Sequence, residues 1–184
     1  MKTSQRAIDR AKPEYADVSL EGEVESKFLY HVVTGSELAP FCTTSLPIAV
    51  LPIEPHGSTY HIVRSDEAQR KGYSGLKKWL LNVEEVWEDK RGEKAEKVDV
   101  YSWLNYANKL TKQTSKTRYK VLYNTSGTYV VASIVKSGPD SFITNNMTLS
   151  ISGKVAGHTT YWFDCENKDE AYYVTCLLYT SPSP

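Results

Sequence analysis

The segment of the sequence with the clearest potential for chemistry is residues 100–139, which contains several Lys and Arg residues and no Asp or Glu. Lysine and arginine neutralise phosphate groups, while tyrosine rings stack on bases and amide and hydroxyl groups hydrogen-bond to bases or backbone. The sequence therefore predicts a nucleic-acid contact formed by Lys109, Lys112, Gln113, Lys116, Arg118, Lys120, Asn124, Thr125 and Ser126. The alternative is that these cations are ordinary solvated side chains on two helices and a hairpin.

The charge of the whole chain does not predict such a partner. The sequence has 22 Lys and Arg residues and 22 Asp and Glu residues, so its formal net charge is zero. The charges are unevenly placed, because acidic residues crowd the segment directly before the acid-free one: Glu84, Glu85, Glu88, Asp89, Glu93 and Glu96. The case for a polyanionic partner therefore depends on this local separation of charge.

A small metal-dependent nuclease is the second function that the sequence suggests. Asp17 followed by Glu25-Ser26-Lys27 has the acidic-x-lysine arrangement with which many nucleases hold a metal ion and activate water. The common cofactor and nucleophile motifs are absent from the sequence. His56 and His61 could approach each other across a turn, but the four histidines lack metal-ligand spacing and the three cysteines form no CxxC pair. The sequence thus predicts no cofactor and no metal in this chain.

A protein-docking module is the third possibility, in which the tryptophans form part of an exposed face: Trp79, Trp87, Trp103 and Trp162. Their positions fit buried faces better. A helix is predicted over 74–91, with Ser74 as N-cap, and its apolar residues recur at the i, i+3, i+4, i+7 spacing of one buried face: Leu76, Trp79, Leu80, Val83 and Trp87. A shorter helix is predicted over 100–110, with Tyr101, Leu104 and Ala107 facing inward.

The elements that would position the basic segment are mostly strands. Residues 27–33 and 60–64 read as strands, and residues 46–54 as an edge strand or a strand broken at Pro52, because proline cannot donate to a sheet ladder. A hairpin is predicted over 118–135, with strands 119–123 and 128–135 joined by a polar turn at 124–127. Further strands are expected at 141–144, 147–151 and 158–165, followed by a helix whose N-cap is Asn167.

Strands and helices are grouped rather than alternating, which predicts an α+β domain with a small mixed or antiparallel sheet and two to three packed helices. The 118–135 hairpin is expected to be the central element, with the 76–91 helix packed on it. We expect three regions: a flexible polar leader at 1–26, the domain at 27–175, and a non-native tail at 176–184. The last segment, CLLYTSPSP, resembles the translation of a sequencing-library adapter.

The chain carries no targeting or membrane signal that the sequence reveals. No apolar run approaches the roughly 20 residues that a bilayer-spanning helix needs, and the first residues lack the apolar core of a secretory signal. We therefore expect a cytoplasmic protein that does not contact the membrane.

Several segments, in their order, resemble a known family. They are FLYHVVTGSELAPF (28–41), IAVLPIE (48–54), LKKWLLNVEEVWEDKRG (76–92), YSWLNYANKLTKQ (101–113), YKVLYNTSGT (119–128) and HTTYWFDCENKDEAYYV (158–174). They are similar to the target-recognition domain of N-6 adenine-specific DNA methyltransferases and of fused, type IIG-like restriction-modification enzymes, akin to the TaqI-like C-terminal specificity domain. The family's closing helix normally continues into an aliphatic run, which CLLYTSPSP replaces here.

The resemblance implies a fragment that grips and reads double-stranded DNA. In that family an S-adenosylmethionine site and an Asn-Pro-Pro-aromatic loop belong to a catalytic domain that has no counterpart in this sequence. We therefore expect no methylation by this chain itself, and we expect the missing methyltransferase domain and duplex DNA as its partners.

Overall fold

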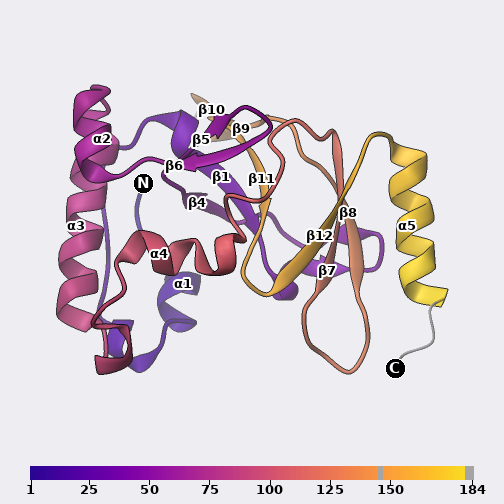
Figure 1. Cartoon of the computed structure of the whole chain (residues 1–184), viewed down its shortest axis with the longest axis horizontal. Coiled ribbons are helices and arrows are strands. Elements are labelled where there is room, and N and C mark those ends of the chain that lie inside the picture. Colours follow the sequence, from indigo (N-terminus) through magenta and orange to yellow (C-terminus); the bar gives the residue numbers. More distant parts are fainter. Residues whose placement is uncertain (145–146, 181–184) are drawn as a thin grey trace. The chain divides into compact units, whose positions relative to one another are not determined.

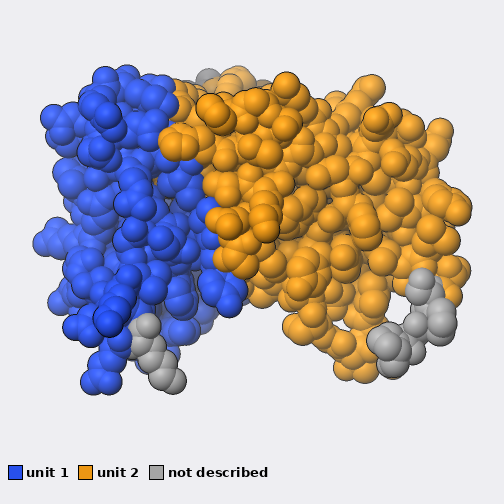
Figure 2. All heavy atoms as spheres, viewed as in Figure 1, with its two compact units in different colours: residues 1–25, 62–106 blue, residues 26–61, 107–184 orange. Residues whose placement is uncertain are grey.

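The computed structural model describes residues 1–144 and 147–180 and has an α+β fold. Its residues group into two compact units, each built from two separate stretches of chain (Figure 2). Unit 1 contains residues 1–25 and 62–106, and unit 2 contains residues 26–61 and 107–184. The predicted boundary after residue 26 lies close to this division, but residues 62–106 group with the predicted leader rather than with the rest of the predicted domain.

Unit 1 is helical and contains no strand of a sheet among its described residues. Its elements are α1 (Gln5–Asp9), η1 (Pro13–Tyr15), α2 (Ser65–Arg70), α3 (Ser74–Lys90), η4 (Glu93–Ala95) and α4 (Val100–Leu104) (Figure 1). The predicted buried face of α3 is present, since Leu76, Leu80 and Trp87 are buried. The indole nitrogen of Trp87 donates to the Val98 carbonyl at 2.9 Å, which ties the segment after α3 back onto it.

The N-terminus of α3 is capped from a distance. The prediction of Ser74 as N-cap is wrong, because Ser74 is the first helical residue and Tyr73 is the N-cap, whose side chain accepts no hydrogen bond from the helix. The Glu25 carboxylate instead accepts from the backbone N–H groups of Gly75 at 3.0 Å and Leu76 at 2.8 Å. Gly75 leaves room for this approach, because a Cβ there would lie 2.8 Å from the Glu23 carbonyl oxygen.

The second predicted helix is shorter than its sequence pattern suggests. It ends at Leu104, and the positive φ angles of Ala107 and Asn108, 53° and 58°, interrupt the helical path. Tyr101 is buried as predicted, while Leu104 is 39% exposed. The inward positions predicted for Leu104 and Ala107 are therefore wrong, because the helical periodicity on which they depend stops after about one turn.

Unit 2 holds the sheets. The strands are β1 (Leu29–Val33), β2 (Leu38–Ala39), β3 (Cys42–Thr43), β4 (Ile48–Val50), β5 (Ile53–His56), β6 (Thr59–Ile62), β7 (Tyr119–Asn124), β8 (Ala132–Lys136), β9 (Asp140–Thr144), β10 (Met147–Ile151), β11 (Gly153–Ala156) and β12 (Thr160–Cys165). One three-stranded sheet has the order β11-β1-β4, with β1 and β11 parallel, and the other has the antiparallel order β12-β7-β8. The 46–54 segment breaks between β4 and β5, where Pro52 was expected to interrupt it.

The predicted hairpin is present as β7 and β8, but its second strand starts at Ala132 and its loop is longer than the predicted four-residue turn. Successive β7 residues point to opposite faces. Val121 packs with Ala132, Cys165 and Ala171, while Leu122 packs on the other face in the cluster of Val33, Val135 and Ala156.

Within unit 2, the helix that packs on the hairpin is α5 (Lys168–Thr180) (Figure 1), whereas the 76–91 helix, which was expected there, groups with unit 1. Its N-cap is Asn167 as predicted, since the Asn167 side chain accepts from the Glu170 N–H at 2.9 Å. The helix continues into the predicted tail, where Leu178 packs on the sheet and the Tyr179 hydroxyl bonds the backbone of Ala132. Residues 181–184 of that tail lie outside the described residues, and its foreign origin stays a prediction.

Candidate nucleic-acid interface

The residues predicted to contact nucleic acid all belong to unit 2, where they run along β7 and the segment before it. Strand pairing in the β12-β7-β8 sheet separates the residues at the start of β7 from those at its end. Arg118 precedes Tyr119, which pairs with Lys136, while Asn124 at the far end of β7 pairs with Thr160. At about 3.4 Å per residue the two ends are roughly 17 Å apart.

Exposed cations lie in the segment that leads into β7 and at the last residue of β8. Lys112, Lys116, Arg118 and Lys136 are all exposed. Within residues 1–144 and 147–180, no salt bridge joins any of these four to an acidic side chain. The Ser137 N–H donates to the Arg118 carbonyl at 2.9 Å, which fixes the end of β8 beside the start of β7. We name these four residues the cationic strip.

Lys109 lies at the other end and is already engaged. Its amine donates to the His158 carbonyl at 3.0 Å and lies 4.3 Å from the centre of the Tyr161 ring. Such a cation–π contact is favourable, and it fixes the position of the amine. Lys109 is half-buried, so it contributes less free charge to the surface than the cationic strip does.

The polar loop residues predicted to touch bases instead hold the β7–β8 loop closed. The Asn124 amide nitrogen donates to the carbonyls of Ser126 at 2.7 Å and Tyr129 at 3.0 Å, and its oxygen accepts from the Val131 N–H at 2.8 Å. The Thr125 hydroxyl donates to the Thr159 carbonyl at 3.3 Å. Asn124 and Ser126 also line a cavity of about 340 Å³. Because the Asn124 amide is used within the loop, reading a base edge would require breaking those bonds.

Two of the predicted contacts, Gln113 and Lys120, are completely buried, and this corrects the prediction. The Gln113 side chain pairs with the Ala156 backbone as a neighbouring strand would. Its oxygen accepts from the Ala156 N–H at 2.8 Å, and its nitrogen donates to the Ala156 carbonyl at 3.0 Å. The Lys120 amine has no hydrogen-bond partner among the described residues. Neither side chain reaches a surface that DNA could touch.

Burial changes the chemistry of Lys120. It lowers the pKa of the amine to about 8, and the neighbouring Asp164 carboxylate opposes that shift. Lys120 and Asp164 face each other across the β7–β12 ladder. The sequence of 119–123, one lysine among apolar and aromatic residues, does not predict this burial, since lysine is almost never fully buried unless paired.

A row of aromatic rings on β7 and β12 lies near the predicted contact residues but was not itself predicted as part of the interface. Tyr123 is parallel to Phe163, with ring centres 5.6 Å apart, and contacts Tyr161 at the same distance. Tyr161 and Phe163 are 45% and 46% exposed. The spacing of the aromatic residues two apart in a predicted strand could have identified this row, because such residues share one face.

The predicted nuclease residues are used structurally. Glu25 caps α3, as described above, and Asp17 accepts a hydrogen bond from Lys90 at 3.0 Å, which lowers the pKa of the Asp17 carboxyl. Lys27 belongs to unit 2 and pairs with Glu54 at 2.8 Å. The structure gives no support to a nuclease centre built from Asp17, Glu25 and Lys27, since each is committed to a different partner.

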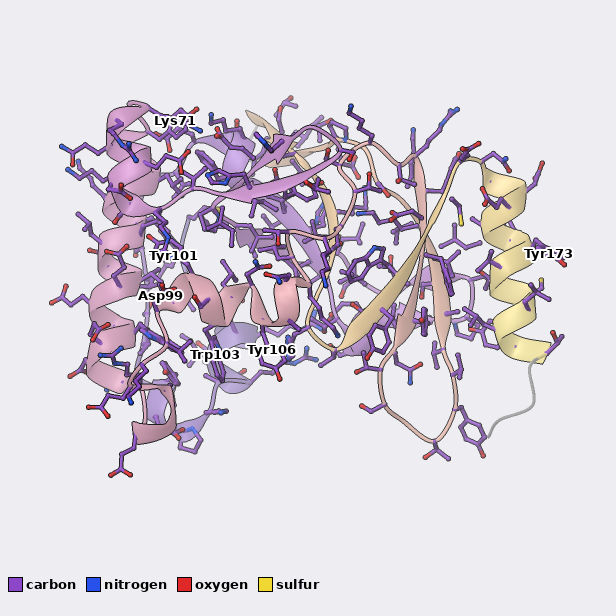
Figure 3. All side chains as sticks on the ribbon, in the orientation of Figure 1. Lys71, Asp99, Tyr101, Trp103, Tyr106 and Tyr173 are labelled. Atoms are coloured by element: carbon purple, nitrogen blue, oxygen red, sulfur yellow. The ribbon has the colours of Figure 1, made fainter. Side chains whose placement is uncertain are left out.

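The tryptophans are divided between core and surface. Trp87 is 9% exposed, whereas Trp103 is 52% exposed and contacts it with ring centres 5.4 Å apart. Figure 3 shows Trp103 and Tyr106 pointing the same way from the α4 region. Trp79 and Trp162 are half-buried. A docking face built from all four is therefore not formed.

The histidine pair suggested by the sequence is loosely placed, with the ring centres of His56 and His61 6.3 Å apart. Across residues 1–144 and 147–180, no group of three His, Cys, Asp or Glu side chains is arranged to hold a metal ion. None of the helices in these ranges is long and apolar enough to cross a membrane.

No family model matches the sequence of this chain, and no curated protein matches it.

Proposed function

We propose that this chain is a DNA-binding module whose contact surface is the cationic strip of unit 2. In this proposal it is the target-recognition part of an adenine-specific DNA methyltransferase or restriction-modification enzyme that works in the cytoplasm. S-adenosylmethionine would belong to the methyltransferase domain of the parent protein. The nuclease alternative lacks comparable support because its residues are engaged in a helix cap and ion pairs, and the docking alternative lacks it because Trp87 is buried and Trp79 and Trp162 are half-buried.

The observation that carries the proposal is that the exposed cations of the cationic strip lie in a segment without acidic residues. Some cations elsewhere in the chain face acids, as Arg64 does with Asp99 at 2.9 Å, while others, such as Lys12, Lys78 and Lys97, are exposed without a salt bridge among the described residues. The strip has no such partner within the described residues and lies in the acid-free segment. Exposed cations without internal partners are the groups that displace counterions from DNA phosphates.

The dimensions of the surface also suit a nucleic acid. The β7 strand spans roughly 17 Å, and phosphates along one strand of duplex DNA are spaced by about 3.4 Å of helix axis. A protein surface of this length can therefore face about five phosphates. Lys109 and the aromatic row lie at the end of β7 away from Arg118, within the same reach.

The test is the salt dependence of duplex binding, measured by fluorescence anisotropy of a labelled duplex. The full chain should bind more weakly as salt rises, and a K112Q/K116Q/R118Q variant should lose about 0.9 from the slope of log K against log salt for each phosphate contact removed. The matched control is K12Q/K78Q/K97Q, which removes three exposed cations of unit 1. Equal losses in both variants, or binding indifferent to salt, would refute the proposal.

The link to a methyltransferase is tested separately by sequencing the genomic frame on both sides of the coding region. An S-adenosylmethionine-binding domain is expected upstream. If another kind of domain is found there while the salt test succeeds, the DNA-binding part of the proposal stands and the parent enzyme is reassigned.

A further inference from the structure

The row of aromatic rings on β7 and β12 is left open by the helix that covers part of the same sheet face. The α5 helix packs on Val121 and Ala132 and lies beside β8 (Figure 1). On the β12 side of that face, Tyr161 and Phe163 remain 45% and 46% exposed. These two rings are therefore accessible to a ligand that stacks on aromatic groups.

The strand fixes how far apart the open rings lie. Tyr161 and Phe163 are two residues apart on β12, so their Cα atoms are separated by roughly 7 Å. Stacked bases along one strand of a duplex are spaced by about 3.4 Å. Two bases held on these two rings would therefore be separated from each other, as bases can be in an unpaired strand.

Cations lie against rings at both ends of this face. The Lys109 amine lies 4.3 Å from the centre of the Tyr161 ring, and the Arg118 guanidinium lies 5.8 Å from that of Tyr119. Lys136 is directly across the ladder from Tyr119, so it shares the face. Lysine and arginine have several N–H donors each, and Lys109 has donated one of its own to the His158 carbonyl.

The acidic side chains of the neighbouring segments are directed elsewhere. Asp164 follows Phe163 in β12 and therefore points to the opposite face, where Lys120 is its partner in the ladder. The Glu170 carboxylate accepts from the Glu166 N–H at 2.7 Å, at the start of α5. A polyanion with apolar rings of its own matches the charge of this face, whereas an apolar protein surface would leave its cations uncompensated.

From this arrangement we infer that Tyr161 and Phe163 stack on unpaired bases of a single-stranded nucleic acid, while Lys109 and Arg118 contact its phosphates. Rings stack on bases that are splayed out of a helix, since the faces of a paired base are covered by its neighbours. The inference goes beyond the proposed duplex contact and does not require it, because neither ring belongs to the cationic strip.

The experiment titrates the full chain into labelled 12-nucleotide oligo-dT and oligo-rU and follows fluorescence anisotropy. Tyr161→Leu and Phe163→Leu should each weaken binding of the single strand about tenfold, since leucine is apolar but has no ring. Phe163→Trp keeps a ring and should bind like the wild type. The control is Tyr173→Leu, which removes a tyrosine of α5 that is 65% exposed (Figure 3) and should leave binding unchanged. Tighter binding of oligo-dT than of oligo-rU would identify the strand as DNA, and the reverse as RNA.

Stacking itself is measured with a strand that contains 2-aminopurine, whose fluorescence falls when the base stacks. The wild type should quench it, and the Tyr161→Leu/Phe163→Leu double variant should quench it much less. Equal affinity and quenching in the wild type and the leucine variants would overturn the inference. So would a dimer, seen by sedimentation velocity, that the double variant abolishes, because a second copy would then cover the rings.

Duplex binding by the same proteins separates this inference from the proposed function. If K112Q/K116Q/R118Q weakens duplex binding while the leucine variants bind the single strand like the wild type, the stacking surface is rejected and the duplex contact stands. If the leucine variants lose the single strand while duplex binding is indifferent to the cationic strip, the duplex contact is rejected and the stacking surface stands.

Discussion

Lys120 shows how far one residue can depart from what its type suggests. Its side chain is completely buried between β8 and β12, and its register partners are Val135 and Asp164. Burial of a charged amine without a hydrogen bond is costly, and a protein relieves that cost by lowering the pKa of the amine. Lys120 therefore makes stability depend on pH in a way that an exposed lysine does not.

The sign of that dependence can be worked out. The folded-state pKa of Lys120 is about 8 against an unfolded value of 10.5, so between these pH values the unfolded chain binds more protons than the folded chain. The contribution of Lys120 to the free energy of unfolding should therefore rise from pH 8 to pH 10. Below pH 8 this contribution is at its lowest. Burial raises the pKa of Tyr30, Tyr60 and the Cys165 thiol, so these groups lower the free energy of unfolding as pH rises toward 10 and oppose the Lys120 effect. The difference between the wild type and a Lys120 variant therefore isolates the contribution of Lys120.

Lys120→Met should remove this rise and stabilise the protein at pH 7 by up to about 3 kcal/mol, at about 1.36 kcal/mol per pKa unit. Urea unfolding at pH 7, 8, 9 and 10 measures it. Lys136→Met, an exposed lysine on the neighbouring strand, is the control and should leave the pH profile unchanged. A profile of Lys120→Met that still rises like the wild type would mean that the amine is solvated in solution.

Gln113 is the second residue whose role differs from its sequence prediction. Gln113→Leu keeps the volume but leaves the N–H and C=O groups of Ala156 without their partner in a buried place. We expect a loss of about 2–4 kcal/mol in the free energy of unfolding, measured by urea titration. Gln69→Leu, at an exposed position of α2, should change it by less than about 0.5 kcal/mol. Similar losses in both variants would show that leucine itself, rather than the lost hydrogen bonds, is responsible.

At the scale of elements, α3 depends on a residue far from it in sequence. Glu25 satisfies two of the N–H groups that every helix leaves free at its start, and its negative charge also suits the helix dipole. Glu25→Ala should therefore lower the free energy of unfolding by about 1–2 kcal/mol. Glu25→Gln should retain part of that free energy, because an amide oxygen still accepts one bond. If both variants are as stable as the wild type, this cap contributes nothing to the stability of the fold.

Local sequence patterns predicted where the helices and strands form, but not which of them pack against each other, because that depends on contacts between residues far apart in the sequence. The α3 face, the β7–β8 hairpin and the break at Pro52 follow from spacing and backbone chemistry within a few residues. The packing of α5 on the hairpin depends on which apolar faces meet, as Val121 and Ala171 do. The early end of α4 depends on the positive φ of Ala107, a residue with no intrinsic preference for it.

The same division applies to the candidate interface. Charge spacing identified Lys112, Lys116 and Arg118, and these are the residues that remain exposed. Spacing could not separate them from Gln113 and Lys120, because the burial of Gln113 depends on its hydrogen bonds to Ala156, far along the chain, and that of Lys120 on its place between β8 and β12. It also could not reveal that Lys136 joins Arg118, which follows from the pairing of β7 with β8.

At the scale of the whole molecule, a chain with zero formal net charge can still bind DNA if its charges are separated between its parts. The acid-rich segment 84–96 belongs to unit 1, and the cationic strip belongs to unit 2. DNA binding should therefore involve unit 2 and spare unit 1, rather than engage the surface evenly.

Hydrogen–deuterium exchange with and without a 20-base-pair duplex tests this separation. Slower exchange is expected within residues 109–137, since bound DNA covers the backbone beside the cationic strip, while residues 65–104 should exchange at unchanged rates. The K112Q/K116Q/R118Q variant should lose the protection, and the K12Q/K78Q/K97Q variant should keep it. Protection centred on α3 and α4 would instead assign the DNA contact to unit 1, where Trp103 and Tyr106 are the most exposed aromatic residues. The cationic strip would then be an ordinary solvated surface, which is the alternative that the sequence left open.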